Sequence, residues 1–193
     1  SKDKALHVGV AKEKTILRDI LQKGLDSISN AELNAIRQRW LPITSGGEKF
    51  DIASMLTAEE IKWLSKHQNF RLGVDPAWAP FEFFDDEGNY SGIGSSYTKA
   101  IGKRLNVTMK PLQGLSWPEV MTKAKAGEVD ILPSVMRTKP RDKYLNFTEP
   151  YISLPIIIAT RKDSPFIDSL SDLAGVKVGV VEGYATIDLL KQD

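Results

Sequence analysis

The sequence contains no cysteine among its 193 residues. This absence excludes disulfide scaffolds, cysteine-rich zinc sites, iron–sulfur clusters and thiol nucleophiles. An excess of charge of either sign is missing too, because 26 lysines and arginines face 25 aspartates and glutamates, for a formal net charge of +1. A chain so balanced creates no field that would gather a nucleic acid or an anionic membrane surface. The composition therefore argues against a nucleic-acid-binding protein.

Long hydrophobic runs are also missing from the sequence. The densest apolar stretch, residues 151–160, contains a proline and is shorter than the roughly 18–20 residues that a membrane-spanning helix needs. We interpret this stretch as a buried strand. Residues 1–4 lack the apolar core of a signal peptide. A segment cut from a longer exported protein would begin in the same way, so export stays open.

Residue patterns for catalysis, metals and nucleotides are scarce. His7 and His67 have no acidic or nucleophilic partner at a useful spacing, which favours structural roles. The acidic residues 85–87 indicate a solvated turn, because a calcium loop needs regularly spaced oxygens and a distal glutamate. The glycines of residues 92–94 lack the third glycine of a nucleotide-binding loop. We expect no cofactor, no metal and no catalytic residue.

The first 44 residues predict a strand followed by two helices. Residues 6–10 alternate like a short strand, and helical spacing of apolar residues begins at Thr15. Ser29 or Asn30 is the expected cap of the second helix, and Pro42 ends it. About 40 residues are too few for an independent hydrophobic core. We expect this part of the chain to belong to something larger.

From Thr57 onward, strand patterns alternate with helix patterns. Thr57 and Glu60 form a capping box, and Ser116 and Glu119 form another, so a helix is expected after each. Two more helices are expected, one capped by Ser95 or Ser96 and one over residues 186–191. The expected strands are 70–74, 81–84, 107–111, 130–133, 146–148, 154–161 and 176–181. This alternation predicts an α/β fold with a largely parallel sheet and helices on its faces.

Large aromatic side chains follow several of these strands. Trp78, Phe81 and Phe83 come after the first strand of the α/β part, and Trp117 begins a helix. Ligands of open α/β sheets bind beyond the carboxyl ends of the strands, where aromatic side chains can clamp small solutes. Arg141 offers a planar fork that suits a carboxylate. The alternative is that these aromatics belong to the core and that Arg141 is a surface residue.

The order of five segments resembles the type-2 periplasmic solute-binding, or Venus-flytrap, family, which is family 3 of the solute-binding proteins. The segments are residues 71–83, 88–93, 125–133, 147–151 and 173–183. The resemblance covers residues 70–193. It implies an α/β fold in which the chain forms a periplasmic-binding-protein type 2 lobe, a parallel-type sheet flanked by helices, with an incomplete second lobe.

In that family the first lobe supplies a polar or acidic residue, aromatic walls and an arginine for the ligand carboxylate, and a helix start of the second lobe meets the ligand. Met136 departs from the small hydroxyl residue of amino-acid binders, and residues 94–96 replace a stretch that usually contains aspartate. Both departures weaken the case for a standard amino-acid ligand. The ligand-binding residues that the resemblance implies are Asp75, Trp78, Phe81, Trp117, Ser134, Met136, Arg141, Tyr184, Ala185 and Thr186.

Two further segments resemble parts of sensor histidine kinases that carry tandem flytraps. Residues 56–67 look like the linker helix before a flytrap module, and residues 5–41 look like the closing strand and two helices of an upstream flytrap. We expect residues 70–150 to form one compact lobe, with 5–41 packed as a separate unit or as a borrowed tail. The implied domains are 1–44, the C-terminal tail of an upstream flytrap; 45–69, a linker with a helix; 70–155, lobe 1; and 156–193, the crossover and the truncated start of lobe 2.

The resemblance implies an extracytoplasmic sensor module that binds a small polar organic solute, an amino acid or an organic acid, and signals by lobe closure. It would lie at the periplasmic face of the inner membrane, be no enzyme itself, and be linked to transmembrane and output domains; pairing with a second copy stays open. One alternative is a periplasmic solute-binding protein of an ABC transporter. Another is the solute-binding-like module of a lytic transglycosylase, or a dehydratase on the same fold.

Overall fold

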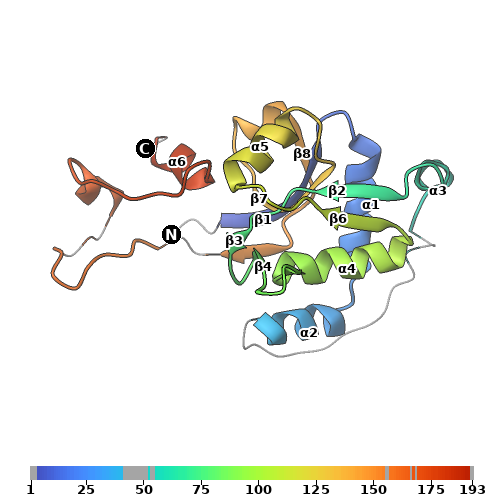
Figure 1. Cartoon of the computed structure of the whole chain (residues 1–193), viewed down its shortest axis with the longest axis horizontal. Coiled ribbons are helices and arrows are strands. Elements are labelled where there is room, and N and C mark those ends of the chain that lie inside the picture. Colours follow the sequence, from blue (N-terminus) through green and yellow to red (C-terminus); the bar gives the residue numbers. More distant parts are fainter. Residues whose placement is uncertain are drawn as a thin grey trace.

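The computed structural model describes residues 4–40, 52, 55–154, 157–165, 167 and 169–191. A six-stranded sheet forms its centre, in the order β6-β2-β7-β1-β8, with β9 paired to the end of β1 (Figure 1). Its strands are β1 (Lys4–Ala11), β2 (Asn69–Leu72), β6 (Thr108–Pro111), β7 (Ile131–Met136), β8 (Leu145–Phe147) and β9 (Ile152–Leu154). A smaller sheet consists of β3 (Ala77–Trp78), β4 (Glu82–Phe84) and β5 (Tyr90–Ser91).

The N-terminal segment, residues 4–40, is built into the main sheet rather than packed as a separate unit. β1 runs antiparallel to β7 and β8 and lies between them, whereas β2 pairs in parallel with both β6 and β7. Leu6, Val8 and Val10 of β1 are almost fully buried. The α/β prediction is therefore confirmed, but the sheet is mixed, because β1 enters it against the direction of its neighbours.

Helices cover both faces of this sheet. Of the helices, α1 (Thr15–Asp26) and α4 (Ile93–Leu105) pack on one face and α5 (Trp117–Lys125) on the other. The remaining helices are α2 (Asn30–Trp40), α3 (Ala58–Leu64) and α6 (Ala185–Leu190), and α6 lies apart from the sheet (Figure 1). Successive residues of β7 point to opposite faces. Ile131 joins the apolar cluster under α1 and α4, while Leu132 joins the cluster under α5. Gly24 lets α1 approach α4 closely, because a Cβ atom there would lie 2.8 Å from the side chain of Ile101.

Both predicted capping boxes are present. The Thr57 hydroxyl accepts the Glu60 amide at the start of α3, and the Glu60 carboxylate accepts the Thr57 amide in return. Ser116 and Glu119 do the same at the start of α5. These local hydrogen bonds satisfy amide groups that a helix leaves free at its first turn, so the sequence is sufficient to place both helix starts.

The predicted start of α4 is wrong. The helix begins at Ile93 with Gly92 as its cap, and Ser95 is already inside it, where its hydroxyl donates to the Tyr90 carbonyl at 2.7 Å. Gly92 has a φ of 104°. A Cβ atom at Gly92 would lie 2.5 Å from the Phe81 carbonyl oxygen. The close approach of the β3–β4 turn therefore fixes the start of the helix, and no serine cap is needed.

Two of the later predictions differ from the structure. Residues 176–181 form no strand, and Val176, Val178 and Val180 are exposed. Alternating valines favour a strand only where a neighbouring strand supplies hydrogen bonds, and none in the described part of the chain pairs with them. The extended stretch expected over 154–161 is a strand only as far as Leu154, and residues 155 and 156 lie outside the described residues.

Candidate functional site: a cleft beyond the ends of β2 and β7

Nine of the ten predicted ligand-binding residues line one cavity, which we call the cleft. Residues 75–78 follow the carboxyl end of β2, and Ser134 and Met136 lie on the last part of β7. Trp117 is the first residue of α5, and residues 184–186 include the start of α6. The residues lining the cleft are Asp75, Trp78, Trp117, Ser134, Met136, Arg141, Tyr184, Ala185 and Thr186. That they bind a ligand stays a prediction.

Arg141 is buried at the edge of the cleft, so its interpretation as a surface residue is wrong. It is 5% exposed, and its guanidinium donates to the Met136 carbonyl at 2.8 Å and to the Gly183 carbonyl at 2.9 Å. Burial lowers the pKa of Arg141, partly offset by Tyr144 and Asp188. No carboxylate in the described part of the chain forms a salt bridge with it. The cleft therefore presents a cation that is bonded to two backbone carbonyl oxygens and to the side chain of Tyr144, with no carboxylate in a salt bridge among the described residues.

Aromatic rings form the walls of the cleft. The indole N–H of Trp117 donates to the Gly183 carbonyl at 3.1 Å, and the Arg141 guanidinium lies 5.8 Å from the Trp117 ring centre. The Tyr184 ring lies 5.9 Å from that of Trp78 and 6.4 Å from that of Trp117. The ring of Tyr184, which precedes α6, thus contacts one tryptophan from β3 and one from α5.

Tyr184 is also bound through its hydroxyl, which donates to the Asp75 carboxylate. The other Asp75 oxygen accepts the Ala77 amide at 3.0 Å, and the residue is 4% exposed. Burial and the bond to Asp75 raise the pKa of Tyr184 above its usual value, so the phenol keeps its proton. This bond links the loop after β2 to the start of α6.

The chain itself fills most of the cleft. Only about 30 Å³ remains free, which is enough for one or two water molecules. Gly183, which has a φ of 76°, brings its carbonyl within reach of both Arg141 and Trp117, and a Cβ atom there would lie 3.4 Å from the Trp117 ring. We call residues 183–186 the closing segment. Its Gly183 carbonyl accepts hydrogen bonds from both Arg141 and Trp117.

A buried polar network below the cleft escaped the sequence analysis. Glu82 is fully buried, and it accepts the Tyr90 hydroxyl and the Asp75 amide. Ser134 Oγ lies 2.8 Å from the hydroxyl of Tyr151, just before β9. Burial raises the pKa of Glu82 to about 8, with the Asp75 charge adding to the effect. The only sequence signal was a glutamate between two phenylalanines, where the burial of a charge cannot be seen.

Gly94 fits this network closely. A Cβ atom there would lie 2.6 Å from Ser134 Oγ, 2.8 Å from Glu82 Oε1 and 2.9 Å from the Tyr90 hydroxyl. Residues 94–96 replace a stretch that usually contains aspartate in the family that the sequence resembles. At position 94 an aspartate would collide with the side chains of this network.

Phe81 is the predicted site residue that does not line the cleft. Its ring lies 5.0 Å from that of Trp78 and packs against the core under α1 and α4. Phe81 therefore packs between the Trp78 ring and the core instead of lining the cleft. The two histidines are bonded to the backbone, His7 to the Thr148 carbonyl and His67 to the Trp63 carbonyl.

The described part of the chain gives no sign of a metal site or a membrane span. No group of three or more histidines, aspartates and glutamates is placed to hold a metal ion there. None of its helices combines the length and the apolar character that crossing a membrane requires.

A profile of the bacterial extracellular solute-binding proteins, family 3, matches residues 70–192. The chain belongs to this family. The resemblance and the fold class inferred from the sequence are thereby confirmed.

Relatives of two kinds are found. The chain is 24% identical over 184 residues to the virulence sensor protein BvgS of Bordetella bronchiseptica, covering 95% of this chain and 15% of that protein. It is 23% identical over 181 residues to the sensor protein EvgS of Escherichia coli, again covering 15% of the relative. The histidine-binding periplasmic protein of E. coli is 30% identical over 121 residues, 60% of this chain and 45% of that protein. The chain thus spans a small part of the sensor proteins.

Solved structures agree with this assignment. The arginine-bound Gly52Ala mutant of the ArgBP protein of T. maritima superposes with a TM-score of 0.59 and 26% identity, over 69% of this chain and 63% of that one. An ancestral amino-acid-binding protein, a precursor of cyclohexadienyl dehydratase, gives a TM-score of 0.58 and 28% identity over 68% of this chain. The solute-binding fold of the described residues is therefore shown by sequence and by structure.

Proposed function

We propose that this chain is the periplasmic solute-binding module of a sensor protein, and that the cleft binds a small organic solute that carries a carboxylate. The observation that carries the proposal is the buried Arg141 guanidinium, which lines the cleft and is bonded to two backbone carbonyls and the Tyr144 side chain rather than to a carboxylate. A ligand carboxylate would replace the Gly183 carbonyl and form a charge-assisted bond, which is about twice as strong as a neutral one. Amino-acid-binding relatives support a ligand of this size.

The extent of the sequence match favours a sensor over a transport protein. The match to BvgS covers 95% of the chain and so takes in the N-terminal segment, whereas the match to the histidine-binding protein covers 60%. We infer the same domain division as from the sequence: 1–44 as an upstream tail, 45–69 as a linker, 70–155 as lobe 1 and 156–193 as the start of lobe 2. Linked membrane and output domains are part of this proposal.

In the proposed mechanism the solute shifts the module between two states. In the first, the closing segment occupies the cleft; in the second, the solute takes over the donors of Arg141 and Trp117 and the closing segment moves. A ligand shifts such an equilibrium only by its differential affinity for the two states. The bond between Tyr184 and Asp75 sets part of the free energy that the solute must overcome. No step of bond chemistry is involved, so the module acts as a receptor and not as an enzyme.

Calorimetric titration of the chain with pools of amino acids and of organic acids tests this proposal. We expect binding to at least one pool and about tenfold or greater weakening in Arg141→Ala, since the lost bond is worth about 1.5–3 kcal/mol. Arg141→Lys keeps the charge but not the fork, and should bind with intermediate affinity. Absence of binding to every pool, with the cleft still closed, would contradict the proposal. Equal binding of neutral analogues would contradict the role of the carboxylate.

A further inference from the structure

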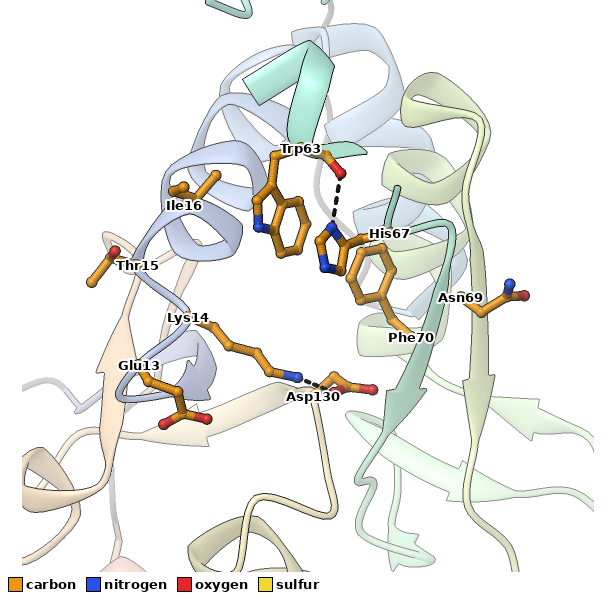
Figure 2. A pocket seen from close by; sticks show the side chains of 9 residues that line it. All are labelled: Glu13, Lys14, Thr15, Ile16, Trp63, His67, Asn69, Phe70 and Asp130. Atoms are coloured by element: carbon orange, nitrogen blue, oxygen red, sulfur yellow. Dashed lines mark hydrogen bonds and ion pairs between the residues drawn. The ribbon is translucent and has the colours of Figure 1, made fainter. Parts of the chain in front are cut away.

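A second cavity, of about 360 Å³, lies at the opposite edge of the main sheet from the cleft. Asn69 and Phe70 belong to the amino end of β2, and Asp130 directly precedes β7, whereas the cleft lies beyond the carboxyl ends of both strands. Residues 13–16, at the start of α1, close one side (Figure 2). Helix α3 and the turn after it close another. The N-terminal segment and lobe 1 therefore meet around this cavity.

Three rings form one wall of the second cavity. The rings of Trp63 and His67 are stacked, with centres 4.0 Å apart and planes 12° apart, and the Phe70 ring is also parallel to that of Trp63 at 6.0 Å. We call these three side chains the aromatic wall. His67 Nδ1 lies 2.9 Å from the Trp63 carbonyl oxygen, which can only accept. In the neutral ring Nε2 is then an acceptor, and Figure 2 shows it on the side of the open space.

The floor of the second cavity holds an ion-pair cluster, in which Asp130 is bonded to Lys14 and to Arg71. The Lys14 ammonium donates to Asp130, whose other oxygen accepts the Arg71 amide at 2.7 Å and its Nε at 2.9 Å. One carboxylate is therefore held by two cations. An ammonium has three donors and Asp130 takes one of those of Lys14. Glu13 also lines the cavity, but Figure 2 shows its carboxylate turned away from the aromatic wall.

We propose that the second cavity binds a small aromatic carboxylic acid. Its ring would pack against the aromatic wall, and its carboxylate would accept from the Lys14 ammonium. The volume falls within the range of about 300–1,000 Å³ typical of small-molecule sites, which combine apolar walls with a few placed polar groups. Such a ligand touches both the start of α1 and the α3–β2 connection. It would fasten the N-terminal segment to lobe 1, independently of the cleft.

Amide NMR spectra of the chain titrated with indole-3-acetate test this proposal. We expect saturable shifts at Lys14, Trp63 and His67, with no shift at Trp117 in the cleft. Acetate, which lacks the ring, and indole-3-ethanol, which lacks the charge, should each bind at least tenfold more weakly. Shifts confined to Trp117 and Arg141 would overturn the proposal and would instead support an acid-binding cleft, so the two proposals fail separately.

Two variants test whether the Lys14 ammonium and the His67 ring contact the bound acid. Lys14→Gln should weaken indole-3-acetate binding about tenfold, because a charge-assisted hydrogen bond is lost. Lys12→Gln, an exposed lysine outside the lining, should leave affinity unchanged. His67→Ala removes one ring while leaving the Lys14–Asp130 pair in place, and should weaken binding several-fold. Unchanged affinity in both Lys14→Gln and His67→Ala, or no saturable shift in the native chain, would overturn the proposal.

Discussion

Arg141 and Trp117 donate to the same atom, the carbonyl oxygen of Gly183, at 2.9 and 3.1 Å. The indole belongs to α5 and the guanidinium to the turn between β7 and β8, and both reach a backbone oxygen that lies more than 40 residues further along the chain. In the proposed function, a ligand oxygen would take the place of this carbonyl oxygen. The cleft is therefore occupied by its own chain.

Tyr184→Phe tests how firmly the closing segment is held. The substitution removes the bond to Asp75 and leaves a buried carboxylate with fewer donors, so we expect the closed state to lose about 1–2 kcal/mol. The indole N–H signal of Trp117 should shift toward that of a solvent-exposed tryptophan. Glu182→Gln, which changes an exposed neighbour, serves as the control. An unchanged Trp117 signal in Tyr184→Phe would show that the hydroxyl bond does not hold the segment.

Glu82 predicts a specific pH dependence of stability. Its pKa is raised by burial from 4.5 to about 8, so the folded state binds this proton more tightly than the unfolded state does. The stabilisation of the folded state by this proton is fully present below pH 4.5 and is lost as the pH rises to about 8, on the order of 5 kcal/mol. Glu82→Gln should flatten the decline in urea-unfolding free energy between pH 5 and 8.

The control for Glu82 is a glutamate in the exposed turn. Glu87→Gln removes a carboxylate of the same type from the surface, and its pH profile should follow that of the native chain. A decline of equal steepness in Glu82→Gln would assign the pH dependence to other groups.

Local features of the fold could be predicted from the sequence, and long-range ones could not. The capping boxes at Thr57 and Ser116 depend on residues three positions apart, so the helix starts follow directly. The place of β1 depends on pairs such as Gly9 with Leu132, more than 100 residues apart, and alternation gives no partner or direction. The start of α4 depends on the approach of Phe81 to Gly92, which is also a tertiary contact.

The candidate site shows the same limit. The order of motifs identified the nine side chains that meet in the cleft, because the family fixes their places at strand ends. Composition and spacing alone left Arg141 undecided between cleft and surface. Glu82 and Tyr151 could not be assigned, since only three-dimensional packing shows that Glu82 is buried beside Asp75 and that the partly buried Tyr151 bonds to Ser134.

Asp130 predicts the opposite pH dependence from Glu82. Burial opposes its ionisation, but bonds from Arg71 and Lys14 outweigh that effect and lower its pKa from 3.8 to about 2. The ionised Asp130 therefore stabilises the folded state above pH 3.8, and this stabilisation is lost as the pH falls through about 2. Because both cations are partly exposed, we expect Asp130→Asn to cost about 1–2 kcal/mol at pH 7 by urea unfolding.

Asp86→Asn is the matched control for this prediction, since Asp86 lies exposed in the turn after β4. It should change the unfolding free energy by less than about 0.5 kcal/mol. A native-like free energy in Asp130→Asn at pH 7 would mean that the ion pairs contribute no net stability.

Gly94→Ala tests the close fit between α4 and the network below the cleft. The new methyl group would lie within 2.9 Å of Ser134, Glu82 and Tyr90, all of which are buried and bonded in place. Overpacking of this kind costs about 1–3 kcal/mol, which exceeds the gain of at most about 1 kcal/mol that alanine offers in a helix. Gly179→Ala, where a Cβ atom meets nothing within 4 Å, should be nearly neutral in the same urea-unfolding measurement. Equal stability of the two variants would show that the network yields to a methyl group, and that an aspartate at position 94 is excluded for some reason other than space.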